Sequence, residues 1–518
     1  MSADSTKKLY LQGLASSFVN LVVVSLNSLL VIRLSLSYLG KEEYGLLSLL
    51  SQVAMYICIL DLGLSVSFSR IMIDYTTGTK ERYAKALKTA SRVFNIVGSI
   101  GFLIAVIVAM AGGSALSIPD HLHRQFVILM IAQGGSLWLQ FHLKTICAPL
   151  IAHGKLYVIL WLNSALTLLN VLVFWLALSG GIGIYSSFIA QGAQLVVSMF
   201  LFSSISKPYR PPQGTPGKFD SSIFKEVVSF ARDSMLWQIG GQTLASMPIL
   251  LASAWYALNT TADLSAGMKL ILLLVSVCTR FGDMSVTPLS IEFANGNEAA
   301  AATQMTRIAG VAGGIGALAA LFIVSVNPAF ISWWMLDKVS WAWHANMTGA
   351  VWVAIISVTQ CMYGYAVVSR QMRLIRWALL AECLMYLMLA ITFRHWAGSA
   401  CLLWAKPVAT LIIGLCVAWQ LKKHTRFDTS RLLPGLLRQG FALALLIPFC
   451  IYFGRLIPIR IHQPFIVFLA SGVLAGVAML VALPLLFTRE TRADLLRILK
   501  GFLVKFRRQK QKTTSFSP

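Results

Sequence analysis

Apolar runs of about 20 residues recur from one end of this 518-residue chain to the other. A helix of about 20 apolar residues crosses the hydrocarbon core of a bilayer, and only helices or closed barrels satisfy their backbone there. These runs lack the alternation of barrel strands. The sequence therefore predicts an all-α polytopic membrane protein with 14 transmembrane helices, over 10–36, 46–68, 88–111, 125–148, 156–178, 184–205, 233–256, 264–290, 306–328, 346–368, 377–393, 400–420, 441–458 and 464–486.

The composition agrees with a membrane protein. Hydrophobic residues make up 57% of the chain and charged residues 12%, whereas soluble domains carry about 25% charged residues. The N-terminal segment is basic and then apolar, like a signal peptide, but it has no small-residue cleavage site. We therefore interpret it as an uncleaved first span.

The net charge of +24 arises mainly from the distribution of lysine and arginine around the spans. If both termini are cytoplasmic, most of these residues fall in cytoplasmic loops and tails, as the positive-inside rule requires. This distribution explains the charge without a nucleic-acid partner and leaves attraction to anionic membrane lipids as its by-product. The outer side then receives Lys41, Arg124, Lys338, Arg394, Arg455 and Arg460.

A charged, proline-rich interruption at 206–230 separates the first six spans from the rest. The last segment places Leu495, Leu499, Phe502 and Phe506 at helical spacing among basic residues, which is typical of an amphipathic helix on the inner leaflet. The predicted organisation is a first lobe of six spans (1–206), a cytoplasmic linker (207–232), a second lobe of six spans (233–421), two extra spans with the basic loop before them (422–487), and a basic cytoplasmic tail (488–518).

The cysteines and histidines do not point to a metal, a cofactor or an enzyme. All eight cysteines lie in or beside spans without a CxxC pair, and the eight histidines have no metal-binding spacing. No outer loop exceeds about twenty residues, whereas enzymes that act on extracytoplasmic sugars usually need a larger loop. We therefore predict a protein that is not an enzyme, with no catalytic residue, metal site or bound cofactor.

Polar residues inside several spans recur at helical spacing. Ionisable residues in a span normally face the bundle interior or a hydrated cavity, because contact with lipid costs several kcal/mol. Taken singly, such residues also serve as hydrogen-bonding contacts between helices. Aligned stripes on several spans instead predict one hydrated cavity between the lobes, to which the two most charged stripes contribute Gln133, Ser136, Gln140 and Lys144, and Lys269, Ser276, Arg280, Asp283 and Thr287.

The predicted cavity is cationic, because basic residues within spans (Arg33, Lys144, Lys269, Arg280 and Lys406) outnumber acidic ones (Asp61, Asp283 and Glu382). A cationic cavity fits an anionic ligand. Those basic residues that lie near span ends could instead extend to the interface. The predicted substrate-binding residues are Arg33, Lys144, Lys269, Arg280, Gln133 and Gln140, and the predicted coupling or gating residues are Asp61 and Asp283.

Asp61 is preceded by fifteen residues without a charge. Two roles fit a carboxylate at this depth. It ties its span to a neighbour by hydrogen bonds or a salt bridge, with Arg280 as a candidate partner, or it takes part in proton or cation coupling. Gly63, two residues later, lets the helix bend or pack closely.

Two motifs carry a resemblance to a known family. "LGKEEYGLLSLL" (39–50) followed by "DLGLSVSFSR" (61–70) resembles the first two helices of polysaccharide-transport proteins of the Wzx O-antigen-flippase type. These belong to the multidrug/oligosaccharidyl-lipid/polysaccharide exporter superfamily. "VTPLSIEFANGN" (286–297) is similar to the matching helix of the second half, although "TRFGD" (279–283) has an arginine where the family pattern has an uncharged residue.

The resemblance implies alternating access by two lobes in the inner membrane of a bacterium. It implies a substrate made of an anionic oligosaccharide on polyprenyl pyrophosphate, a unit for O-antigen, capsule or exopolysaccharide. Polysaccharide polymerase and glycosyltransferases would be partners, the two extra helices would form a groove for the lipid tail, and coupling to H⁺ or Na⁺ stays open. The alternative is a multidrug or cation-coupled exporter of the same superfamily.

Overall fold

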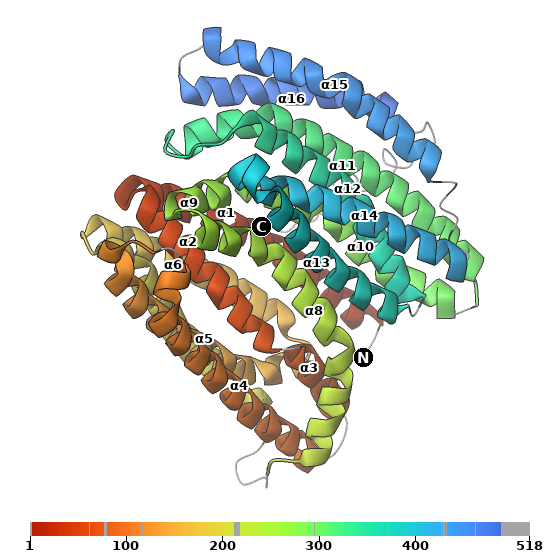
Figure 1. Cartoon of the computed structure of the whole chain (residues 1–518). Coiled ribbons are helices and arrows are strands. Elements are labelled where there is room, and N and C mark those ends of the chain that lie inside the picture. The colour runs from red at the N-terminus through yellow and green to blue at the C-terminus, as the bar shows by residue number, and fades with distance from the viewer. Residues whose placement is uncertain are drawn as a thin grey trace, which may run out of the picture. The chain divides into compact units, whose positions relative to one another are not determined.

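The computed structural model describes residues 3–487 except 62, 77–79, 117, 212–217, 295, 370, 426, 428–429, 431 and 461–462. The predicted basic tail and the centre of the predicted linker lie outside these residues. All regular elements in the described part of the chain are helices (Figure 1). The helices form two compact units: the first consists of 1–269, 334–341 and 376–405, and the second of 270–333, 342–375 and the chain from 406.

Eleven helical segments of the described chain are long and apolar enough to cross a membrane, or twelve if the bent pair Leu258–Gly267 and Lys269–Arg280 counts as one span. In this count the two helices between Met372 and His424 form one segment. The protein is therefore a multi-pass, all-helical membrane protein. The number of fourteen spans, the sides of the termini and the lobe boundaries stay predictions.

The first unit contains the N-terminal helices. Its helices α1 and α6 pack against each other, as do α4 and α5, and α2 and α9. The elements are α1 (Ala3–Tyr38), α2 (Lys41–Cys58), the short 3-10 helix η1 (Ile59–Asp61), α3 (Leu64–Thr76), α4 (Lys80–Ala115), α5 (Asp120–Ala152), α6 (Leu156–Ser179), α7 (Ser186–Ser206), α8 (Ser221–Trp255), α9 (Leu258–Gly267) and most of α13 (Met372–Ala397).

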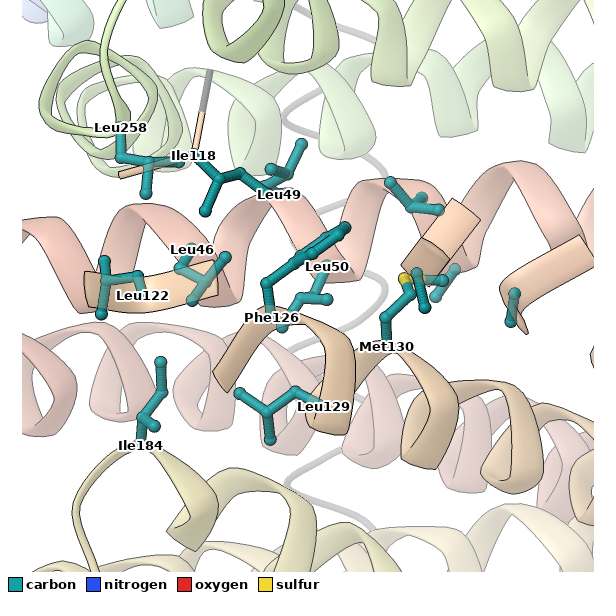
Figure 2. Close-up of a cluster of buried hydrophobic side chains, with 14 of the residues drawn as sticks. Leu46, Leu49, Leu50, Ile118, Leu122, Phe126, Leu129, Met130, Ile184 and Leu258 are labelled. Carbon is teal, nitrogen blue, oxygen red and sulfur yellow. The ribbon is translucent and has the colours of Figure 1, made fainter. Parts of the chain in front are cut away.

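Helix α2 has two different faces. One face is apolar at helical spacing, from Leu46 and Leu49 to Ile57, and it is buried against α5 around Phe126 and Met130 (Figure 2). Ser48 and Ser51 lie among the residues of its other stripe, which lines a pocket described below. The apolar face packs the helix into the unit, and the polar stripe faces the pocket.

The second predicted span, 46–68, is not one continuous helix. Helix α2 ends at Cys58, η1 follows, and α3 starts at Leu64. Gly63 has a φ of 78°, a left-handed conformation that glycine adopts without steric cost and other residues rarely adopt. The break places Asp61 at the junction of two helices.

The second unit is built on close helix contacts. Gly316 of α11 faces Ser357 of α12 so closely that no Cβ would fit, and Gly349 faces Ile271 in the same way. Small residues of this kind let membrane helices approach each other. The elements are α10 (Lys269–Ala294, from residue 270), α11 (Glu298–Trp334), α12 (Trp343–Val368), α14 (Cys401–His424, from residue 406), α15 (Leu433–Arg460) and α16 (Pro464–Leu486).

Candidate functional site

A polar pocket of about 490 Å³ lies within the first unit. Its longest wall is the stripe of α2 from Tyr44 to Cys58, which are 14 residues apart and so span about 21 Å at 1.5 Å per residue. Helices α1, α5, α6 and α7 form the other walls, together with Ser265 of α9 and Lys269. The pocket is therefore a long cavity that runs along most of α2.

Amide side chains dominate the polar lining of this pocket. An amide carries two donor hydrogens and one acceptor oxygen, so it can either donate a hydrogen bond to a hydroxyl group or accept one from it. The side chains of Gln133, Gln140, Gln191 and Gln194 form no hydrogen bond with any residue that the structure describes, so their donors and acceptors are available to a ligand. The amides that line the pocket are Asn27, Gln52, Gln133, Gln140, Asn170, Gln191 and Gln194.

Lys269 is the one charged side chain among the described residues that line the pocket. It is the first residue of α10 and follows Ser265 by one helical turn. The hydroxyl groups of Ser265 and Tyr44 are 3.2 Å apart and hydrogen-bonded, which joins α9 to the beginning of α2. A single cation therefore lies toward this end of the pocket, and no lining carboxylate neutralises it.

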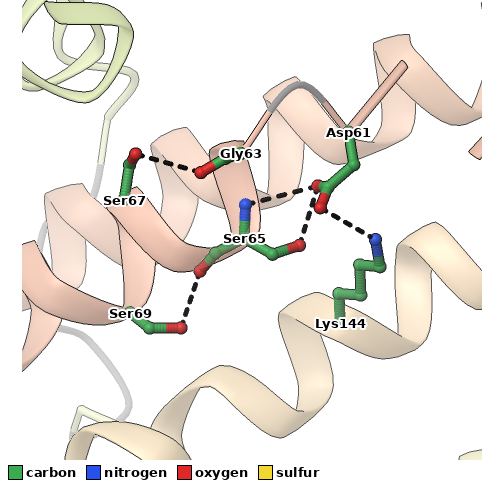
Figure 3. Close-up of polar contacts among 6 residues, drawn as sticks. All are labelled: Asp61, Gly63, Ser65, Ser67, Ser69 and Lys144. Carbon is green, nitrogen blue, oxygen red and sulfur yellow. Dashed lines mark hydrogen bonds and ion pairs between the residues drawn. The ribbon is translucent and has the colours of Figure 1, made fainter. Parts of the chain in front are cut away.

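Asp61 forms an ion pair with Lys144 of α5 (Figure 3), with 3.4 Å between carboxylate Oδ2 and ammonium Nζ. The other carboxylate oxygen accepts hydrogen bonds from the backbone N–H (3.3 Å) and the hydroxyl (2.7 Å) of Ser65, in the first turn of α3. The hydrogen bonds of Asp61 thus stabilise the start of α3, and its ion pair connects the break between η1 and α3 to α5. The sequence named Arg280 as a candidate partner, and the partner in the structure is Lys144.

The ion pair lies beyond the end of the pocket that is opposite Lys269. Gln140, a lining residue, precedes Lys144 by one turn on α5, and Cys58, another, precedes Asp61 by three residues. The Lys144 ammonium also lies 4.6 Å from the centre of the Phe141 ring, a cation–π distance. The ion pair therefore lies next to the amide-lined region, with its two charges matched.

The structure brings some of the predicted substrate-binding residues together and separates others. Gln133, Gln140 and Lys269 line the same pocket. Arg33 does not line it: this side chain donates a 3.4 Å hydrogen bond to the carbonyl of Trp334 and stacks over its ring. The polar stripes were expected around a cavity between two lobes, and the pocket that several of them line is inside the first unit.

Arg280 belongs to α10 in the second unit. Its side chain is exposed and does not line the polar pocket, and the structure gives it no hydrogen bond or ion pair with a described residue. The side chain of Asp283 lies outside the described part of the chain. Lys406 and Glu382 are buried, and the Lys406 ammonium lies 4.3 Å from the centre of the Trp352 ring.

Sequence reasoning missed the contribution of α2 and α9 to the pocket. The helical spacing of Ser48, Ser51 and Gln52 on α2 could have indicated that this helix lines the pocket. It was missed because these residues are small or stand isolated within an apolar run. Ser265 gave no signal in the sequence. No group of three or more His, Cys, Asp or Glu side chains that could hold a metal ion is found among the described residues.

No protein-family model matches the sequence, and no curated protein matches it. Among solved structures, the chain is similar to an inward-facing multidrug resistance MATE family transporter of the MOP superfamily, with a TM-score of 0.69, 13% identity, and coverage of 77% of this chain and 96% of that chain. It is also similar to the lipid II flippase MurJ in an inward closed conformation, with a TM-score of 0.67, 13% identity, and coverage of 90% and 97%.

A MATE transporter of Vibrio cholerae, VcmN in the bent form, gives a TM-score of 0.53 with 15% identity and coverage of 83% of this chain and 99% of that chain. The chain therefore has the fold that MATE transporters and MurJ share. At these identities the likeness concerns the fold alone.

Proposed function

We propose that this protein is a flippase for an oligosaccharide linked to polyprenyl pyrophosphate, a repeat unit of O-antigen, capsule or exopolysaccharide. It would move this substrate from the cytoplasmic to the outer leaflet of a bacterial inner membrane by alternating access. The observation that carries the proposal is the lining of the pocket, in which the described residues supply seven amide side chains and one cation but no carboxylate. The protein would act as a transporter and not as an enzyme.

The chemistry of the lining matches the two polar parts of such a substrate. Sugar hydroxyls donate and accept hydrogen bonds, and an amide side chain that forms no hydrogen bond with the described residues offers them both donors and an acceptor. The Lys269 ammonium offers a charge-assisted hydrogen bond to a phosphate oxygen. Gln133 and Gln140 would bind the sugar, and Lys269 would bind the anionic group. Arg33, Lys144 and Arg280 stay proposed substrate contacts at other stages of transport.

The proposal places the chain in the polysaccharide-transport branch of the MOP superfamily. The motifs at 39–50 and 61–70 support this branch. The alignment with MurJ, named a lipid II flippase, also covers a larger share of this chain than that with the inward-facing MATE transporter. Glycosyltransferases would supply the substrate and a polymerase would consume the product. Asp61 and Asp283 stay candidates for coupling to H⁺ or Na⁺.

A multidrug or cation-coupled exporter is the second candidate, since MATE transporters share the fold. Pockets for drug-sized ligands are lined mostly by apolar and aromatic side chains, and a cationic drug also needs an acidic partner. Among the described lining residues, Tyr44 and Phe188 are aromatic, several such as Leu47 and Leu129 are aliphatic, and the one charged residue is basic. The lining therefore favours a polar, anionic substrate.

Deletion of the gene tests the proposal. The inner membrane of the deletion strain should accumulate polyprenyl-linked repeat units, which extraction and mass spectrometry would detect and identify. Complementation with Lys269→Ala should leave this accumulation, and Lys269→Arg should relieve it in part. A deletion strain with normal levels of lipid-linked intermediates, together with raised sensitivity to cationic drugs, would favour the exporter instead.

A further inference from the structure

A second cavity lies in the first unit, and it is apolar. This groove of about 400 Å³ is formed by α1 and α6. Nearly all of its lining consists of leucine, valine and tryptophan side chains, and Asn27 is the one amide in it. The lining residues are Val23, Leu26, Asn27, Leu30 and Leu34 of α1, and Leu168, Val171, Leu172 and Trp175 of α6.

Helices α1 and α6 contribute residues to both the apolar groove and the polar pocket. Val31, Ser35 and the α6 residue Asn170 line the pocket, while the neighbouring leucines line the groove. Both cavities share Asn27, whose side-chain oxygen is buried and has no hydrogen-bond partner among the described residues. Asn27 is therefore the one described residue that the linings of the two cavities have in common.

A substrate with a charged head and an apolar chain needs two such environments side by side. Keeping each CH₂ group away from water contributes about 0.8 kcal/mol, so a polyprenyl chain would not be stable among hydrated amides. A pyrophosphate would be equally unstable in an apolar groove. The junction of a polar and an apolar cavity matches the junction of head and chain in one molecule.

We propose that the groove between α1 and α6 binds the first isoprene units of the polyprenyl chain while the pyrophosphate and sugars occupy the polar pocket. This inference rests on the proposed function and adds the place where the chain lies. Asn27 marks the point where the substrate passes from one cavity to the other. The family resemblance implies that the extra helices α15 and α16 form the groove for the lipid tail. In the arrangement proposed here, they are not needed to bind the isoprene units next to the phosphate.

The test fills the groove without touching the pocket. Leu172 is 50% exposed and lines the groove, and Leu176, one turn later on α6, is 53% exposed and does not line it. Leu172→Trp is the test variant and Leu176→Trp its matched control, with Leu26→Trp filling the groove from α1. Binding of undecaprenyl pyrophosphate and of methyl pyrophosphate is measured for the full chain in nanodiscs.

We expect Leu172→Trp and Leu26→Trp to weaken binding of undecaprenyl pyrophosphate at least about tenfold and to leave methyl pyrophosphate binding unchanged. Leu176→Trp should change neither. If Leu172→Trp binds undecaprenyl pyrophosphate as Leu176→Trp does, the chain lies elsewhere and the inference is wrong. The same conclusion follows if Leu172→Trp changes only the oligomeric mass, because the groove would then hold a second copy of the chain.

The wild-type protein separates this inference from the proposed function. If the wild type binds neither probe, the proposed function is wrong, and the inference about the groove, which rests on it, is wrong as well. If the wild type prefers undecaprenyl pyrophosphate and the groove variants retain that preference, the proposed function stands and the inference alone is overturned.

Discussion

Amide side chains serve different purposes in two regions of the molecule. In the second unit, Asn327 donates a 2.6 Å hydrogen bond to Asn346, and Gln439 donates to the carbonyl of Gly310, so these amides connect helices. In the first unit, the amides of Gln133 and Gln191 line a pocket and form no hydrogen bond within the described structure. The amides of Asn327 and Gln439 thus connect helices, whereas those of Gln133 and Gln191 are open to a ligand.

Helix spacing explains this difference. Where glycine lets two helices approach, as at Gly316 against Ser357 and at Gly45 against Leu258 near the beginning of α2, there is no room for a cavity. Along the polar stripe of α2 the facing helices stand far enough apart to leave about 490 Å³. Spacing, and not polarity alone, decides whether a polar stripe can bind a ligand.

The largest expected effect comes from removing the close approach in the second unit. Gly316→Leu would place a side chain where Ser357 already lies, and overpacking of this kind costs about 1–3 kcal/mol or more. We expect little folded protein by size-exclusion chromatography. Gly192→Leu on α7 is the control, because no described atom outside the adjacent stretch of its own helix lies within 4 Å of the position of its Cβ. Equal losses for both variants would contradict the contrast in helix spacing.

Removing cations one at a time compares the two units directly. Lys269→Ala removes the charge from the pocket and should reduce export of the glycan at least about tenfold, a loss of about 1.4 kcal/mol or more in stabilisation. Arg280→Ala removes an exposed charge from the second unit and should reduce export less. Export is measured as surface polymer at matched expression. A larger loss for Arg280→Ala would move the main anion site to the second unit.

Amide replacement should separate stability from transport. Asn327→Leu leaves the buried Asn346 without this partner and should lower the free energy of unfolding by about 1–2 kcal/mol. Gln191→Leu removes an amide that forms no hydrogen bond with the described residues, so the melting temperature should stay near that of the wild type while export falls. Thermal unfolding in detergent and polymer export are measured together. The contrast fails if Gln191→Leu unfolds earlier than Asn327→Leu.

The smallest effect is expected at Asp61. Asp61→Asn keeps an acceptor for Ser65 and loses the ion pair with Lys144, whose side chain is 37% exposed, so we expect a cost below about 1 kcal/mol. Asp61→Ala should cost more, because the acceptor at the start of α3 is also lost. If wild-type transport depends on an H⁺ or Na⁺ gradient, Asp61→Asn should keep that dependence, because the ion pair with Lys144 gives Asp61 a structural role. Loss of that dependence would instead make Asp61 a coupling residue.

Much of the helical fold could be predicted from the apolar runs, because spanning a bilayer fixes both length and composition. The break at Gly63 was harder to predict, since a glycine in an apolar run signals flexibility but not a positive φ. Gln133, Gln140 and Lys269 were identified from helical spacing and line one pocket. The partner of Asp61 could not be predicted, because tertiary packing, and not position within one helix, brings Lys144 to it.

The most direct test of the central claim is flipping by a variant without two of the pocket's amides. Gln133→Leu/Gln140→Leu, reconstituted in proteoliposomes with a fluorescent oligosaccharide on polyprenyl pyrophosphate, should keep the wild-type melting temperature to within a few degrees. Its flipping rate should fall at least about tenfold, because the sugar loses two hydrogen-bond partners whose side chains form no hydrogen bond with the described residues. A folded double variant that flips the substrate at the wild-type rate would contradict the claim that this pocket binds the head of the substrate.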